Sequence, residues 1–266
     1  MTDPQKTAPQ DMAESEVLAG RRAVIIGGAS GIGWGAAQRF VRAGARVVIA
    51  DRDAQGARTR AEQLGRGAEW AEADVAEELT LERLFAKHDT VHSVLNCAGV
   101  NIPGRLIDYP LESWRTVLEV SLTGAFLVAK HAGRALADGG TLTSIASLNA
   151  RQPAAGFGAY CAAKAGLTML TEVAALELAP RGIRANAISP GLVETPLVTG
   201  LTSVPEIQAE FTDNTPLGRN GTVEDIAEVA LFLASDASSW MTGEVLDVNG
   251  GAHLRRYPDV MAKLSR

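Results

Sequence analysis

The chain has 266 residues, of which 46% are hydrophobic and 21% charged, with a formal net charge of −6 at pH 7. This composition excludes a disordered chain and is sufficient for one α/β domain with a single core. The acidic balance provides no basic surface for nucleic acid or an anionic membrane, so we expect a small-molecule partner.

The first predicted strand, residues 22–26, leads into a glycine-rich turn and then a helical pattern. The turn reads Gly27-Gly28-Ala29-Ser30-Gly31-Ile32-Gly33. Glycines permit positive φ and a close approach of backbone to ligand, and the start of a helix favours negative charge. The segment therefore predicts a cradle for a pyrophosphate, although such turns also serve as simple tight connections.

A second predicted strand, residues 46–50, ends at Asp51. An acidic residue at this distance from a glycine turn commonly binds the ribose hydroxyls of an adenosine. Asp51 would repel a 2′-phosphate, so it favours NAD over NADP, while the adjacent Arg52 supplies a compensating positive charge. The alternative is that Asp51 is a solvated residue at the start of the next connection.

Five more strands are predicted at residues 68–72, 91–96, 141–146, 183–188 and 244–248, with helical patterns between them. Alternating strands and helices indicate a parallel sheet with helices on both faces. We expect a doubly wound, three-layer Rossmann-like fold with seven strands. It forms a single domain over residues 21–252, after a flexible leader at 1–20 and before a tail at 253–266.

Tyr160 and Lys164 stand four residues apart in a predicted helix, and Ser147 follows the strand at 141–146. Residues at this spacing share a helix face, with Cβ atoms roughly 5 to 6 Å apart. An adjacent ammonium favours phenolate and lowers the pKa of a tyrosine, which makes the phenol a better base. Ser147 would extend from the carboxyl end of its strand, where open α/β sheets bind ligands. The pattern predicts a proton-transfer site.

Residues 191–221 form the longest predicted irregular stretch, interrupted by Pro196, Pro205 and Pro216. Long loops usually carry function, so this segment is the candidate substrate lid; the alternative is a poorly ordered surface insert. The apolar helices predicted at 111–136 and 157–179 suggest self-association. In the tail, Arg255, Arg256 and Tyr257 would contact a neighbouring subunit or be solvated, as terminal residues usually are.

No apolar stretch reaches the roughly 18 to 20 residues needed to cross a bilayer, and residues 1–20 lack the features of a signal peptide. Cys97 and Cys161 are the only cysteines, without metal-ligand spacing. We therefore expect no metal site, no structural disulfide and a cytoplasmic location.

Together these motifs resemble the short-chain dehydrogenase/reductase family of the compact, single-domain type, across approximately residues 20 to 252. The matching segments are Gly27, Gly31 and Gly33, Asp74-Val75, Asn96-Cys97-Ala98-Gly99, Ser147 with Tyr160 and Lys164, Ser189-Pro190-Gly191 with Thr195, and the final Val245 to Gly251. They occur in the order that the family shows.

The resemblance implies an enzyme that binds a nicotinamide coenzyme and transfers a hydride. The coenzyme residues that it implies are Gly27, Ser30, Gly31, Ile32, Gly33, Asp51, Arg52, Asp74, Val75, Asn96, Ala98, Gly99, Tyr160, Lys164, Pro190, Gly191, Val193 and Thr195. The catalytic residues are Ser147, Tyr160, Lys164 and Ser121. The family also builds tetramers from its two central helices, so a homotetramer is expected.

Two positions depart from the family pattern. Ile26 stands where the family usually has a threonine that braces the glycine turn, and Ser121 stands where it usually has an asparagine that completes a catalytic tetrad. Serine can hydrogen-bond backbone and perturb a helix locally. We expect Ser121 to take the place of the asparagine in proton supply.

The predicted function is the NAD(H)-dependent interconversion of a secondary alcohol and a ketone, with Tyr160 as general acid and base. A regulatory protein that binds NAD(H) and has lost useful catalysis is the alternative. The predicted substrate-pocket residues are Asn101, Ile102, Leu148, Asn149, Phe157 and Leu192. They do not identify the substrate, because the same fold serves many.

Overall fold

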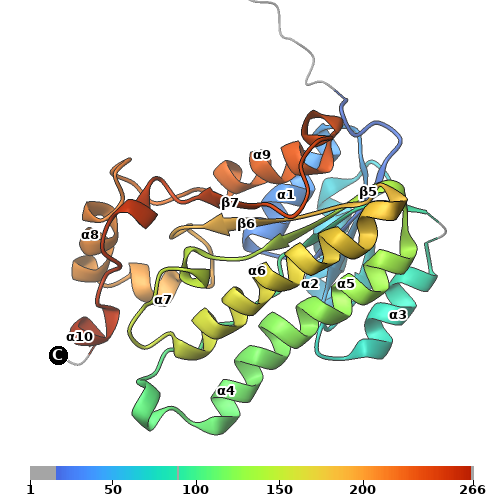
Figure 1. Cartoon of the computed structure of the whole chain (residues 1–266). Helices are drawn as coiled ribbons and strands as arrows, with labels where there is room; N and C mark the ends of the chain where they lie inside the picture. The colour runs from blue at the N-terminus through green and yellow to red at the C-terminus, as the bar shows by residue number, and fades with distance from the viewer. Residues whose placement is uncertain (1–15, 89, 265–266) are drawn as a thin grey trace, which may run out of the picture.

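The computed structural model describes residues 16–88 and 90–264 (Figure 1). Seven parallel strands form one sheet in the order β3-β2-β1-β4-β5-β6-β7. They are β1 (Arg22–Ile26), β2 (Arg46–Asp51), β3 (Glu69–Glu72), β4 (Val91–Asn96), β5 (Leu136–Ile145), β6 (Arg184–Pro190) and β7 (Val245–Val248). The predicted Rossmann-like sheet is confirmed.

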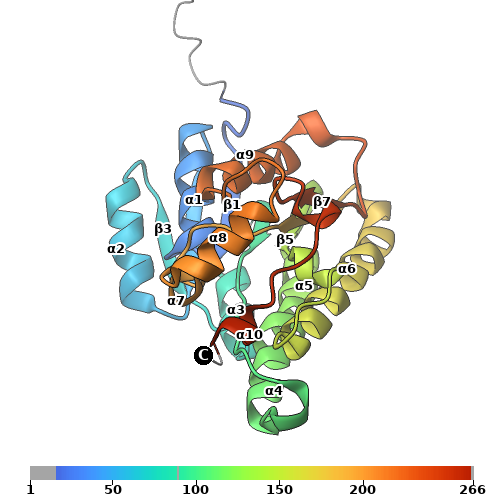
Figure 2. The same cartoon turned by 90° about the vertical axis from the view of Figure 1, so that its left-hand side faces the viewer.

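Helices cover both faces of the sheet, which gives the three layers seen in Figures 1 and 2. One face carries α1 (Gly31–Arg42), α2 (Ala54–Leu64) and α9 (Val223–Ala234), and the other carries α3 (Glu78–Ala86), α5 (Gly124–Ala135) and α6 (Gly158–Leu178). The shorter helices are α4 (Leu111–Leu118), α7 (Thr199–Thr202), α8 (Pro205–Asp213) and α10 (Val260–Leu264).

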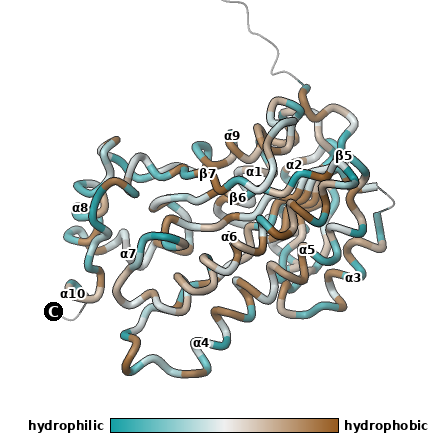
Figure 3. Tube along the Cα trace, viewed as in Figure 1, coloured by the Kyte–Doolittle hydropathy of each residue, from teal (hydrophilic) through white to brown (hydrophobic). Residues whose placement is uncertain are grey.

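The central strands are apolar along their length because they are buried on both faces. In β1, Ala23 and Ile25 pack on the side of α1 and α9, while Val24 and Ile26 pack on the side of α3 and α5. Successive side chains of a strand point to opposite faces, so one run of five residues supplies two cores. Figure 3 shows the hydrophobic segments gathered in the central strands.

The strand order reverses at β1, which has β2 on one side and β4 on the other. In open α/β sheets, the crevice at the carboxyl ends of the strands beside such a reversal is where ligands bind. This position places the turn after β1 and the segment after β4 on the two sides of one crevice.

The helix predicted over 111–136 is divided by a π-helical segment, η2 (Glu119–Thr123), between α4 and α5. The chain then enters β5 at Leu136, five residues before the predicted start of that strand. Leu136 pairs with Val91, and the register shifts before Thr141 pairs with Ser93. The early start of β5 depends on pairing with Val91 of β4, and a local sequence pattern cannot predict a contact with another strand.

Residues 191–221 are more regular than predicted, because they contain α7 and α8. Pro205 does not interrupt structure there but occupies the first turn of α8. The fixed φ of proline suits this position, and its missing N–H has no helical partner to lose. The base of the segment is closed by the bridge between Val193 and Gly221.

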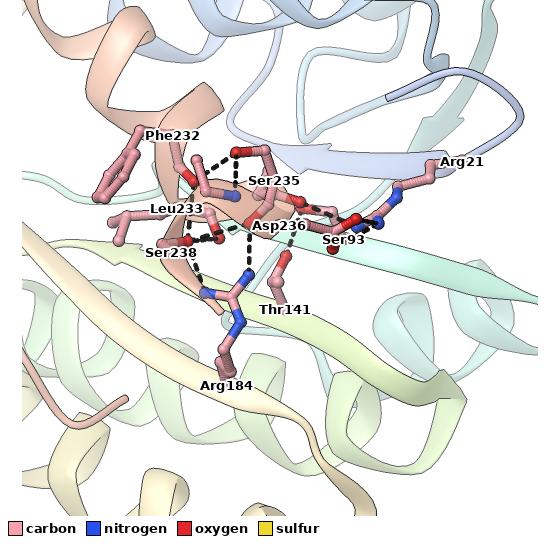
Figure 4. A network of polar contacts seen from close by, with 11 residues as sticks. Arg21, Ser93, Thr141, Arg184, Phe232, Leu233, Ser235, Asp236 and Ser238 are labelled. Carbon is pink, nitrogen blue, oxygen red and sulfur yellow. Dashed lines mark hydrogen bonds and ion pairs between the residues drawn. The ribbon is translucent and has the colours of Figure 1, made fainter. Parts of the chain in front are cut away.

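A polar network closes the edge of the sheet opposite the ligand crevice (Figure 4). Arg184, at the start of β6, donates to Ser238 Oγ at 2.7 Å and to the Ser235 carbonyl at 2.9 Å. Arg21 pairs with Asp236 at 2.7 Å. These contacts anchor the end of α9 to the amino ends of β6 and β1, so the network is structural.

The end of the predicted leader packs on the domain. Leu18 is fully buried, and its N–H donates to the Ala43 carbonyl at 2.9 Å. Residues 1–15 lie outside the described residues. Within the described part of the chain, no helix is long and apolar enough to span a membrane.

Candidate functional site

The glycine turn joins β1 directly to α1 and requires its glycines. Gly27 and Gly31 have φ of 71° and 50°, and a Cβ on Gly33 would lie 2.1 Å from the Gly27 carbonyl oxygen. The turn therefore folds back on the start of the helix with no room for a side chain. Its backbone is open to a ligand at the helix N-terminus, an arrangement that suits a phosphate.

Ile26 has no hydroxyl to stabilise the glycine turn, in contrast to the threonine usual in the family. Backbone hydrogen bonds and one carboxylate stabilise the turn instead. Gly27 N and Gly28 N donate to the Ala50 carbonyl at 2.8 and 3.2 Å. Asp51 accepts from Ala29 N at 3.0 Å through Oδ2. Ile26 itself is fully buried in the core, so its side chain contributes packing in place of a hydrogen bond.

A pocket of about 310 Å³ lies over these residues at the carboxyl edge of the sheet. Of the residues predicted to bind a coenzyme, it is lined by Gly27, Ser30, Gly31, Ile32, Gly33, Asp51, Arg52, Asp74, Val75, Ala98, Gly99, Tyr160, Lys164, Pro190, Gly191, Val193 and Thr195. Asn96 is the exception. Its side chain is buried and accepts from Ala98 N at 3.1 Å. Asn96 therefore stabilises the turn after β4 from the protein interior and lies behind the pocket wall.

Lys164 is buried at the junction of α6 and the sheet. Its Nζ donates to the Ile145 carbonyl at 2.6 Å and lies 5.6 Å from the centre of the Tyr160 ring. Gly99 permits this position, since a Cβ there would be 3.3 Å from Nζ. Burial lowers the pKa of Lys164 to about 8, because an ammonium loses its hydration there.

Tyr160 and Ser147 meet across the same crevice. The Ser147 hydroxyl hydrogen-bonds with the Tyr160 phenol and also accepts from Asn149 N at 3.1 Å. Burial raises the pKa of Tyr160, while the hydrogen bond with Ser147 lowers it. Desolvation is the larger of these effects, so the net shift is upward, and the lowering of the Tyr160 pKa by Lys164 stays a prediction.

Ser121 lies at the centre of the π-helical segment and is fully buried. Its Oγ donates to the Val100 carbonyl at 3.2 Å and accepts from Val100 N at 3.1 Å. A single hydroxyl thus satisfies both backbone groups of the residue that follows Gly99. Ser121 holds the wall of the crevice on which Lys164 packs, and it does not line the coenzyme pocket itself.

A second pocket, of about 90 Å³, opens beside the first and shares Ser147 and Tyr160 with it. Five of the predicted substrate residues line it: Asn101, Leu148, Asn149, Phe157 and Leu192. Ile102 does not. Its side chain is partly exposed, and its carbonyl accepts from the Tyr109 hydroxyl at 2.6 Å outside the pocket.

The carboxyl-terminal tail supplies residues to this pocket that were not predicted there. Arg256, Tyr257 and Pro258 line it, together with Phe211 and Asn214 from the lid segment. Tyr257 is not solvated but packs edge-on against the rings of Phe157 and Phe211. No local pattern could place Tyr257 against two aromatic rings that are distant in the sequence.

Comparisons with known proteins agree with this geometry. The family model described as enoyl-(acyl carrier protein) reductase matches residues 27–253. A cis-4-hydroxycyclohexanecarboxylate dehydrogenase of Sinomonas cyclohexanicum is 38% identical over 89% of this chain and 98% of its own. A 2,5-dichloro-2,5-cyclohexadiene-1,4-diol dehydrogenase of Sphingobium indicum is 35% identical over 88% and 96%.

Solved structures show the same likeness. A short-chain type dehydrogenase/reductase from Mycobacterium ulcerans superposes with a TM-score of 0.89 at 36% identity, covering 93% of this chain and 95% of that one. A gluconate 5-dehydrogenase from Burkholderia cenocepacia, in complex with NADP and tartrate, has a TM-score of 0.86 at 32% identity over 90% and 98%.

The fold and the crevice define a nucleotide-binding oxidoreductase of the Rossmann type. The chain belongs to the short-chain dehydrogenase/reductase family, as its motifs indicated.

The buried Lys164 predicts a pH-dependent stability. The unfolded lysine binds a proton up to about pH 10.5 and the folded one up to about 8, so the unfolded state binds more protons in between. The cost of burying the ammonium is complete below pH 8 and disappears as the pH rises to 10.5. At about 1.4 kcal/mol for each pKa unit, the change is on the order of 3 kcal/mol.

Urea unfolding of the wild type and of Lys164→Met across pH 7 to 10.5 measures this effect. The free energy of unfolding of the wild type should rise relative to the variant over that window. A constant difference between the two proteins would show that Lys164 is not desolvated.

Proposed function

We propose that the protein is an NAD(H)-dependent oxidoreductase that interconverts a secondary alcohol and a ketone. The observation that carries this proposal is the meeting of the two pockets at Ser147 and Tyr160. A coenzyme in the larger pocket and an alcohol in the smaller one would face each other across these two side chains. Relatives named for cyclic alcohols and diols support the same class of reaction.

The larger pocket fits a nicotinamide coenzyme. Its glycine turn would hold the pyrophosphate, Asp51 the adenosine ribose, and Pro190, Gly191 and Thr195 the nicotinamide end. When bound, the coenzyme supplies the hydride acceptor or donor. The protein contributes orientation and the handling of one proton.

Tyr160 would take the proton of the alcohol during oxidation and return it to the carbonyl oxygen during reduction. Ser147 would hydrogen-bond the same substrate oxygen and so hold it beside the phenol. Lys164, with a pKa of about 8, lies near enough to Tyr160 to favour its ionised form once that proton is to leave. Ser121 would support the route to solvent by fixing the backbone of Val100, the residue after the Gly99 on which Lys164 packs.

Asp51 supports a preference for NAD over NADP. Both of its oxygens accept backbone hydrogen bonds, from Ala29 N and Asp53 N, which hold the carboxylate at the end of β2 facing the pocket. A 2′-phosphate would approach this fixed negative charge. Arg52 also lines the pocket, and the related gluconate 5-dehydrogenase holds NADP, so the preference needs a direct measurement.

The regulatory alternative is favoured only by the departure at Ser121, whose hydroxyl is fully engaged by the Val100 backbone. Binding of NADH together with complete inactivity over a panel of polyols, hydroxyacyl thioesters, steroids and cyclic alcohols would support it. A cytoplasmic location stays a prediction of the sequence.

Replacing Tyr160 with phenylalanine should lower kcat by about 10² to 10⁴-fold and leave NADH binding nearly unchanged, because only the proton-transferring hydroxyl is lost. Turnover is followed by NADH absorbance and binding by fluorescence titration. Tyr109→Phe is the matched control, since its hydroxyl bonds the Ile102 carbonyl outside both pockets. Turnover retained in the Tyr160 variant would refute the assignment.

Replacing Asp51 with asparagine should raise the ratio of kcat/KM for NADP over NAD about tenfold or more, since the repelling charge is removed and one of the two hydrogen-bond acceptors is kept. Asp53→Asn is the control, because Asp53 caps α2 and does not line the pocket. Equal ratios in all three proteins would show that Asp51 does not select the coenzyme.

We also propose a homotetramer built through α5 and α6. The outer faces of these helices expose the apolar side chains of Phe126, Met169, Val173 and Leu176, which association would bury. Light scattering coupled to size exclusion should give about four times the mass of the chain. A single monomeric species would contradict this association.

A further inference from the structure

The carboxyl-terminal tail crosses the mouth of the substrate pocket. Figure 2 shows this red segment passing between α8 and α6. Gln152 Nε2 donates to the Arg255 carbonyl at 2.6 Å, the Tyr257 ring contacts Phe157 and Phe211, and Val260 is buried. The tail is therefore held on one side by Gln152 and Phe157, which precede α6, and on the other by Phe211 of α8.

This placement brings one charged side chain to the pocket. Among the described residues that line it, Arg256 alone carries a charge, and the others are apolar, amide or hydroxyl side chains. A pocket with a single guanidinium and no carboxylate in its lining is electrostatically suited to an anion.

The surroundings of Arg256 leave donors of its guanidinium free for a ligand. Its Nη2 contacts Glu210 Oε1 at 3.2 Å, and Lys263 Nζ lies 4.0 Å from the other oxygen of Glu210. One carboxylate thus stands between two cations, and the three residues together carry a net positive charge. Because a guanidinium has five N–H donors in a planar fork, Arg256 can keep Glu210 and still receive a second carboxylate.

Among the described residues, two amide side chains of the pocket lining have buried oxygens without a hydrogen-bond partner. Asn101 Oδ1 and Gln152 Oε1 are buried and accept no hydrogen bond from the residues that the structure describes. Both oxygens are closed to solvent, so they are not offered to a ligand in the open pocket. At about 90 Å³ the pocket is small compared with common ligand sites, which favours a compact substrate over a long acyl chain.

We propose that Arg256 determines substrate specificity by binding the carboxylate of a compact hydroxy acid whose secondary alcohol lies at Tyr160 and Ser147. This inference rests on the proposed function. In the oxidation, the carbinol C–H leaves as hydride to the oxidised nicotinamide coenzyme and the O–H proton goes to Tyr160. The carbon becomes a ketone, while the carboxylate on Arg256 is unchanged.

The first experiment compares a hydroxy acid with its neutral counterpart on the full-length enzyme. The probes are 4-hydroxycyclohexanecarboxylate and 4-hydroxycyclohexanecarboxamide, which differ in charge and hardly in size. Arg256→Gln should lower kcat/KM for the acid by about 10- to 100-fold, mostly through KM, and leave the carboxamide nearly unaffected. Arg256→Lys should recover part of the loss, because it restores the charge without the planar fork.

Arg255→Gln is the matched control. Arg255 is the adjacent arginine in the same tail and is exposed, but its side chain does not line the pocket. It should leave both substrates unchanged. Equal losses for acid and carboxamide in Arg256→Gln, or equal effects of the two arginines, would overturn the proposal.

A binding measurement separates this inference from the proposed function. Cyclohexanecarboxylate has no alcohol to oxidise, so calorimetric titration into the NADH-loaded protein reports the anion site alone. Its affinity should fall about tenfold or more in Arg256→Gln and not in Arg255→Gln. Unchanged affinity would refute the role of Arg256 even if alcohols are oxidised, and a specific loss would support it even if none of the alcohols tested is oxidised.

Discussion

The hydrogen bond from the Lys164 ammonium to the Ile145 carbonyl is the contact on which the geometry of the site depends. It attaches α6 to the carboxyl end of β5, two residues before Ser147 and one helical turn from Tyr160. Because the bond is buried and made by a charged donor, it is shielded from competition with water. The relative positions of Ser147 and Tyr160 follow from it, and so does the point at which the two pockets meet.

Burial at this junction has an electrostatic consequence. The same desolvation lowers the pKa of Lys164 to about 8 and raises that of Tyr160, so the two groups move apart in their affinity for a proton. Tyr160 therefore holds its proton more tightly than Lys164 does. Two positions of the crevice lack the side chain that is usual in the family. At Ile26, backbone hydrogen bonds to Ala50 stabilise the turn that follows. At Ser121, the hydroxyl bonds both backbone groups of Val100.

The substrate side is assembled differently from the coenzyme side. Residues around the coenzyme pocket come mostly from the ends of strands, where the sheet holds them in place. Residues around the smaller pocket come in part from the segments after β4 and β6, and also from α8, the segment before α6 and the carboxyl-terminal tail. A rigid redox centre is therefore combined with walls that can differ without changing the reaction, which is how one fold accepts different substrates.

Local sequence patterns predict the seven strands, the glycine turn, the position of Asp51 and the approach of Ser147 to Tyr160. These features depend on local periodicity and on residue types at short spacing, and parallel strands necessarily bring their carboxyl ends to one edge. Contacts between distant segments place Asn96 behind the larger pocket, and they place Ile102 outside the smaller pocket, which Arg256 and Tyr257 line. The tertiary structure also decided the pKa of Lys164 and Tyr160. Burial and contacts between distant segments set these properties, and neither is encoded in the spacing of neighbouring residues.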